Sequence, residues 1–96
     1  MSGVQRVRLL AFGRVQGVGF RDFCCRIGKS CHLAGYAKNL ADGTVEIVAE
    51  GEEERIGEFC RRISVKLQGG ISVERLQEVS CEKISSKGFA SFSVGY

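Results

Sequence analysis

Two stretches of the chain have apolar residues at helical spacing, and each stretch has a single apolar stripe. The first is predicted over about residues 21–33, with a stripe formed by Phe20, Cys24, Ile27 and Cys31. The second is predicted over about residues 53–67, with a stripe formed by Ile56, Phe59, Cys60, Ile63 and Leu67. A helix with one apolar stripe buries that stripe against one neighbour, so two such helices cover one face of a sheet.

The segments around these helices favour β-strands. The predicted strands are residues 4–12, two strands of a hairpin within 35–51, about 71–82, and about 90–96. The hairpin is expected to turn at Asp42-Gly43, a dipeptide that tolerates the backbone angles of a tight turn. The alternation near Leu76 is imperfect, which indicates a bulge. In the last strand, one face is expected to carry Ala90, Phe92, Val94 and Tyr96.

This order, β-α-β-β-α-β plus a short C-terminal strand, predicts an α+β, ferredoxin-like two-layer sandwich. We expect an antiparallel sheet with the first and third strands central and both helices on one face. At 96 residues, the chain is expected to form a single domain over 1–96. Gly28 should weaken the first helix by about 1 kcal/mol relative to alanine, and Gly35 should stop it. Gln68-Gly69-Gly70 should end the second helix.

Composition excludes several classes of function. A net charge of +3, without a clustered basic stripe, argues against a dedicated nucleic-acid binder. No apolar run is long enough for a membrane span and the N-terminus has no signal-peptide pattern, so we expect a cytoplasmic protein. The five cysteines lack C-x-x-C spacing, which argues against a disulfide framework and a zinc site. By helical phase, Cys24 should face the core and Cys25 should be partly exposed.

The segment 12-FGRVQGVGFRDF-23 places three glycines where a strand should pass into a helix. It matches neither the Walker A motif nor G-x-G-x-x-G. However, backbone N–H groups in glycine conformations form concave anion sites, and a helix N-terminus adds further donors. Arg21 lies at that helix start, where its charge opposes the helix dipole and a bound anion would remove the mismatch. The alternative is that Arg21 is a solvated surface residue.

Asn39 is the second notable polar residue, because asparagine is depleted in strands. It either lies on the exposed face of its strand close to the hairpin turn, or it reaches the glycine-rich loop. Periodicity leaves both alternatives open.

Two segments, 13-GRVQGVGFR-21 and 35-GYAKNLADGTVEIVAEG-51, together resemble the two signatures of the acylphosphatases. These are small single-domain enzymes with a ferredoxin-like fold that hydrolyse the carboxyl–phosphate bond of acyl phosphates. The resemblance covers essentially the whole chain, including the aromatic C-terminal strand. It implies hydrolysis of a small acyl phosphate to a carboxylate and inorganic phosphate, with no metal and no organic cofactor.

The resemblance also implies roles for individual residues. Arg21 would bind the substrate phosphate, Asn39 would hold the nucleophilic water, and Thr44 would support the site. The backbone amides that would form the phosphate cradle are those of Val15, Gln16, Gly17, Val18, Gly19 and Phe20. Leu40 stands where some animal members carry a hydroxyl residue, and Gly95 where they carry arginine, which argues against a contribution from the C-terminus.

Two other functions compete with this one. The first is a non-catalytic ferredoxin-like module that binds an anionic ligand or a nucleic-acid phosphate, which would need Arg21 but not a water-positioning Asn39. The second is a detached relative of the acylphosphatase-like domain of larger carbamoyl-transfer maturation proteins, which the lack of zinc-finger cysteines disfavours. We therefore expect a monomer that binds a small acyl phosphate and has neither nucleic acid nor membrane as a partner.

Overall fold

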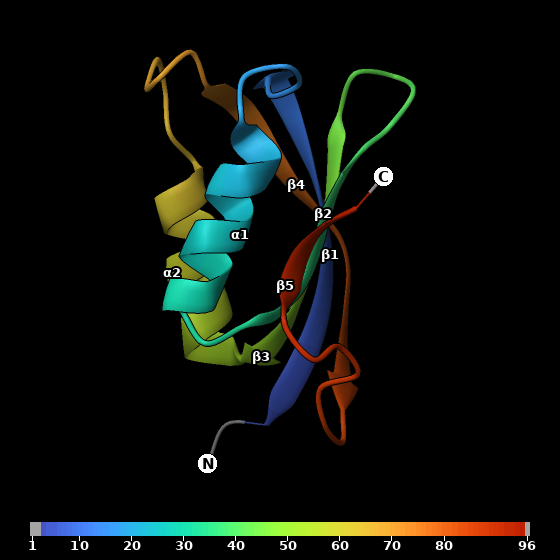
Figure 1. Cartoon of the computed structure of the whole chain (residues 1–96). Coiled ribbons are helices and arrows are strands. Elements are labelled where there is room, and N and C mark those ends of the chain that lie inside the picture. The colour runs from blue at the N-terminus through green and yellow to red at the C-terminus, as the bar shows by residue number, and fades with distance from the viewer. Residues whose placement is uncertain (1–2, 96) are drawn as a thin grey trace.

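The computed structural model describes residues 3–95, in which strands and helices follow the predicted order (Figure 1). The elements are β1 (Val4–Arg14), α1 (Phe20–Ser30), β2 (Ala34–Asn39), β3 (Val45–Glu52), α2 (Glu53–Ile63), β4 (Ser72–Ile84) and β5 (Phe92–Gly95). The strands form one sheet in the order β4-β1-β3-β2-β5, and both helices cover the same face of it. The predicted ferredoxin-like α+β fold is confirmed, with β1 and β3 inside the sheet.

The sheet is mixed, so the prediction of a wholly antiparallel sheet is wrong for the last strand. β1 pairs antiparallel with β3 and β4, β2 pairs antiparallel with β3, and β5 pairs parallel with β2. The direction of β5 follows from the topology. β4 and β2 run in opposite directions and lie on opposite sides of β1 and β3. After β4 the chain crosses to the other edge of the sheet and reverses its direction. β5 therefore runs alongside β2 in the same direction as β2. Two residues predicted to share one face of the last strand are not part of it as described. Tyr96 lies outside the described residues, and Ala90 is exposed and precedes β5.

The core lies between the sheet and the two helices. Val7, Leu9 and Ala11 alternate along β1 toward the helices, as the sequence predicts, and all three are buried. α1 packs over β2 and β5, and α2 packs against β3 and α1. The largest fully buried core side chains include Phe20, Phe59, Phe92, Ile47 and Ile63.

Helix α1 ends earlier than predicted, at Ser30, and His32 takes the place expected for a glycine. His32 has a φ of 59°. The N–H of Leu33 donates to the carbonyl of Gly28 (2.9 Å), and that of His32 to the carbonyl of Lys29 (3.0 Å). These two bonds form a Schellman motif, which satisfies the last carbonyls of the helix. Gly35 instead lies within β2, where a Cβ would be 1.8 Å from the Val48 carbonyl oxygen.

Helix α2 also ends before the predicted residue, at Ile63. Leu67, placed by periodicity on the apolar stripe, has a φ of 54° and a side chain that is 88% exposed. Gln68 and Ile71 exchange two backbone hydrogen bonds of 2.9 Å around Gly69-Gly70, both with positive φ. The glycines therefore form a separate tight turn after the helix, rather than the helix end itself.

Gly28 is required by packing, although a glycine lowers helix propensity. An alanine Cβ at this position would lie 2.5 Å from Cδ2 of the buried Phe92 ring. We expect Gly28→Ala to destabilise the chain by about 1–2 kcal/mol, because overpacking at the upper end of its usual range of about 1–3 kcal/mol exceeds the gain of about 1 kcal/mol in helix propensity. Urea unfolding measures this difference. The matched control is Gly57→Ala in α2, where the nearest atom is a flexible Arg61 Nη1 at 3.5 Å; it should be neutral or stabilising. A Gly28→Ala variant as stable as wild type would contradict this account.

β4 has two irregularities, at positions that flank the one predicted. Arg8 and Leu9 pair with Ser80 and Glu78, which leaves Val79 as an extra residue. Phe12 and Gly13 pair with Arg75 and Val73, which leaves Glu74 as an extra residue. Each insertion is a bulge that bends and twists the edge strand against β1.

The sheet face opposite the helices carries a buried carboxylate. Glu50 is fully buried, and its Oε1 accepts hydrogen bonds from the backbone N–H groups of Gly88 (2.6 Å) and Phe89 (3.1 Å). Its Oε2 accepts from Nε of Arg6 at 2.6 Å. Burial alone would raise the pKa of Glu50, but the donors of Phe89, Arg6 and Gly88 outweigh it and the pKa is lowered. Glu50 thus ties the segment between β4 and β5 to the sheet.

Cys25 is buried, so the prediction that it is partly exposed is wrong. Cys24 and Cys25 are 0% and 8% exposed, and burial raises the pKa of both thiols. All five cysteines are free. A buried thiol with a raised pKa stays protonated at neutral pH, so both side chains serve as small core hydrophobes.

Among residues 3–95, no helix has the length and apolar character that crossing a membrane requires.

Candidate active site

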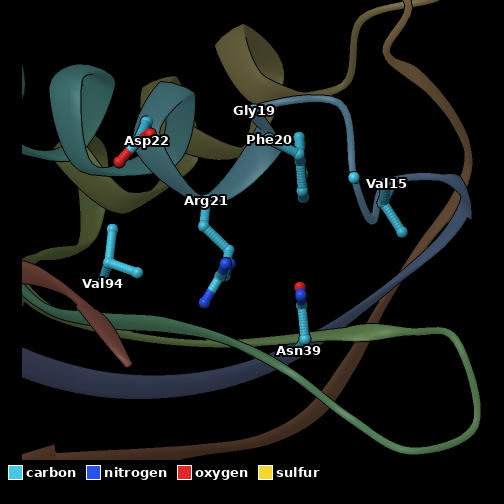
Figure 2. Close-up of a pocket in the computed structure, with 8 residues that line it drawn as sticks. Val15, Gly19, Phe20, Arg21, Asp22, Asn39 and Val94 are labelled. Carbon is cyan, nitrogen blue, oxygen red and sulfur yellow. The ribbon is translucent and has the colours of Figure 1, made fainter. Parts of the chain in front are cut away.

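A pocket of about 210 Å³ lies where the β1–α1 loop, the start of α1, the end of β2 and β5 meet (Figure 2). Its walls are formed by Val15, Gly17, Gly19, Phe20, Arg21, Asp22, Asn39 and Val94. The pocket therefore brings together most of the loop predicted to bind an anion and the asparagine whose position the sequence left open. Val94 and Asp22 are wall residues that were not predicted.

The β1–α1 loop is anchored at both ends and shaped by two glycines. Val15 and Phe20 are each 1% exposed and hold the loop to the core. Gly17 and Gly19 have φ values of 73° and 80°. Because a Cβ at either position would meet nothing within 4 Å, it is conformation rather than space that requires glycine there. Alternating left-handed residues turn successive N–H groups toward one side, and the first turn of α1 adds N–H groups with no intrahelical acceptor. This arrangement suits a phosphate or carboxylate.

Arg21 reaches into the pocket from the first turn of α1 and is half-buried, so the solvated-surface alternative is wrong. Its Nη1 donates to the carbonyl oxygen of Gly95 at the end of β5 (2.9 Å). Figure 2 shows its guanidinium directed toward the strand that carries Asn39. The C-terminal strand therefore contributes to the site after all, through a backbone carbonyl rather than a side chain.

Asn39 reaches the pocket because it lies on the helix-covered face of the sheet. It is the last residue of β2 and shares a face with the fully buried Ala37, so the exposed-face alternative is wrong. Figure 2 shows its carboxamide pointing toward the loop. Its Oδ1 is buried and accepts no hydrogen bond from residues 3–95. An unsatisfied buried acceptor lowers stability by about 1–3 kcal/mol. A hydrogen-bond donor that entered the pocket and bonded to this oxygen would remove that cost.

The other predicted site residues lie outside the pocket wall. Val18 packs against the core beside Gly70. Thr44 is buried in the β2–β3 loop, where its Oγ1 and its N–H both donate to Oδ1 of Asp42 (2.6 and 3.0 Å). The Thr44 hydroxyl, followed by its N–H, lowers the pKa of Asp42. Gln16 extends its side chain toward this same β2–β3 loop, a contact that the sequence did not reveal.

Comparison with known proteins identifies the family. The model of the family described as acylphosphatase matches residues 7–94. The chain belongs to the acylphosphatase family. The chain is accordingly an acylphosphatase, a hydrolase whose substrate is an acyl phosphate. The resemblance of the two sequence segments to acylphosphatase signatures is thereby confirmed.

Individual acylphosphatases are similar over almost their whole length. The acylphosphatase of Petrotoga mobilis is 39% identical over 89 residues, which cover 93% of this chain and 96% of that relative. The crystal structure of acylphosphatase from Bacillus subtilis has a TM-score of 0.79 and 35% identity, and covers 96% of this chain and 99% of that one. Full-length HypF, in its phosphate- and nucleotide-bound form, has a TM-score of 0.82 and 28% identity. That match covers 100% of this chain but only 12% of HypF, so the acylphosphatase fold also occurs within a much longer protein.

Proposed function

We propose that the chain hydrolyses the carboxyl–phosphate bond of small acyl phosphates in this pocket, with Arg21 and Asn39 as its catalytic residues. The observation that carries the proposal is the buried Oδ1 of Asn39 beside the glycine-rich loop, which accepts no hydrogen bond from the described residues 3–95. A pocket that only bound an anion would be lined by donors. An acceptor next to an anion site calls for a hydrogen-bearing group between the two, and a water molecule meets that need.

The loop and Arg21 would hold the phosphoryl group. Backbone N–H groups of residues 15–20 and the guanidinium provide donors for its oxygens, on which charge is spread in the transition state. The bond between Arg21 Nη1 and the Gly95 carbonyl limits the rotamers of the arginine, so less conformational freedom is lost when substrate binds.

Asn39 would position the attacking water. Its Oδ1 accepts one hydrogen of the water, which leaves an oxygen lone pair free to face phosphorus. As the new P–O bond forms, the bond to the acyl oxygen breaks and the carboxylate leaves with the electron pair. A carboxamide does not take up the water proton, so the proton passes to a phosphoryl oxygen. The carboxylate is already a good leaving group, so no further acid is required.

The proposal is tested by hydrolysis of benzoyl phosphate in the presence of EDTA. We expect saturable turnover with a kcat on the order of 10 s⁻¹ or higher, unaffected by the chelator and competitively inhibited by inorganic phosphate. Chelator-sensitive turnover would contradict the metal-free mechanism. Binding of phosphate, followed by its ³¹P resonance, without turnover would instead support the anion-binding module.

A further inference from the structure

The side chain of Gln16 links the phosphate-binding loop to the β2–β3 loop. Its Nε2 donates to the carbonyl oxygens of Leu40 and Thr44, both at 2.8 Å. A carboxamide nitrogen carries two hydrogens, so each carbonyl receives one. The side chain is partly buried, and the bonds span 24 and 28 residues of sequence.

The two acceptors belong to a braced turn. The Thr44 carbonyl also accepts from the N–H of Leu40 (2.9 Å), and the Leu40 carbonyl accepts from the N–H of Gly43 (3.2 Å). The Asp42 carboxylate accepts from both the N–H and the hydroxyl of Thr44. Gln16 thus attaches to a turn with its own internal hydrogen bonds, and this turn begins directly after Asn39.

The strands connect the two halves of the pocket indirectly, through β3. The loop follows β1, whereas Asn39 ends β2, and β3 lies between these strands in the sheet. Val45 of β3 pairs with Asn39 on one side and with Ala11 of β1 on the other. Within residues 3–95, Asn39 is therefore joined to the loop by strand pairing through Val45, and not by a direct pair with β1. The Gln16 carboxamide adds a direct link from the loop to the turn that follows Asn39. Its own backbone N–H belongs to the loop that would hold the phosphate.

We propose that Gln16 is a positioning residue that fixes the separation between the phosphate cradle and the Asn39 carboxamide. Its side chain acts through Asn39, by holding the turn next to it, and makes no contact with the reacting atoms. This inference rests on the proposed function, in which Asn39 positions the water. Since a displacement of about 1 Å at a reacting centre costs up to 100-fold in rate, a loosened turn lowers turnover without weakening phosphate binding.

Gln16→Met tests the proposal, because it keeps the length of the side chain and removes both donors. We expect kcat for benzoyl phosphate to fall by about 10-fold or more, and the inhibition constant of inorganic phosphate to stay within about twofold of wild type. In ¹⁵N spectra of Gln16→Met, the backbone N–H groups of Leu40 and Gly43 should exchange with solvent faster. The matched control is Gln77→Met on the exposed part of β4, which should leave all these values unchanged.

A double-mutant cycle separates positioning from a general effect on the loop. In an Asn39→Ala background, Gln16→Met should lower kcat by less than about twofold, because the residue that it positions is already gone. A fully additive loss would overturn the proposal, as would a phosphate inhibition constant that rises in parallel with the loss of kcat. The Asn39→Ala variant alone tests the proposed function. If it behaves like wild type, the assignment of the water site fails whatever Gln16→Met shows.

Discussion

Asn39→Ala is expected to lower kcat for benzoyl phosphate by about 100-fold, the usual cost of losing one positioned transition-state contact. The truncation removes the buried Oδ1 that would orient the water, so attack on phosphorus loses its fixed direction. The glycine-rich loop and Arg21, which would bind the phosphate, remain in place. Inhibition by inorganic phosphate should therefore stay within about twofold of wild type, because product binding needs donors and not the asparagine oxygen.

Asn39→Asp gives an informative comparison, because it keeps an oxygen at Oδ1 but adds a negative charge. It should lose turnover and also bind phosphate less well, since the two anions repel. Wild-type turnover in Asn39→Ala would show that the water is positioned elsewhere. An equal loss of phosphate inhibition in Asn39→Ala would mean that Asn39 binds the phosphate itself.

Arg21→Ala is expected to impair both turnover and phosphate binding. We expect kcat to fall by about 100-fold and the phosphate inhibition constant to rise by about 10-fold or more, because in the proposed mechanism the guanidinium would contact the phosphoryl oxygens in both the transition state and the product complex. Steady-state kinetics with phosphate as inhibitor measure both values. Arg21→Lys should recover only part of the loss, since a lysine supplies charge but not a planar pair of donors.

Arg26→Ala is the matched control for Arg21→Ala. It removes one positive charge from the same helix, but Arg26 is exposed and its guanidinium lies over the Phe23 ring, 5.5 Å from the centroid. It should leave kcat and phosphate inhibition unchanged. If Arg26→Ala weakened phosphate inhibition as much as Arg21→Ala, the effect would be one of overall charge, and the assigned contact would be wrong.

Periodicity predicted the strands, the helices and their layering, because burial on one face imposes a regular pattern on the sequence. It did not predict the helix ends. α1 stops through a Schellman motif in which His32, not a glycine, adopts a positive φ. α2 stops before Leu67, whose hydrophobic character fits the stripe although its side chain is exposed. Both ends depend on local backbone geometry that apolar spacing does not encode. The parallel pairing of β5 depends on which edge it joins, which is a property of the whole sheet.

The candidate site was predictable where its residues are contiguous in the sequence. The glycine-rich loop and Arg21 form one continuous segment, so their chemistry could be inferred locally. The pairing of Arg21 with the Gly95 carbonyl and of Gln16 with the Leu40 and Thr44 carbonyls could not. A backbone carbonyl is present at every residue, so the sequence does not indicate which carbonyl a given side chain contacts.

The irregular pairing of β4 has a consequence for how the chain behaves among its own copies. A long edge strand presents a row of backbone groups that can template intermolecular β-sheet, the first step of many aggregates. β4 is 13 residues long, but the extra residues at Glu74 and Val79 interrupt its regular spacing. Both faces of β4 also carry charged side chains, such as Arg75 on one face and Glu78 on the other. The opposite edge, β5, is only four residues long. Neither edge is a good template, so we expect the folded chain to resist edge-to-edge association in concentrated solution.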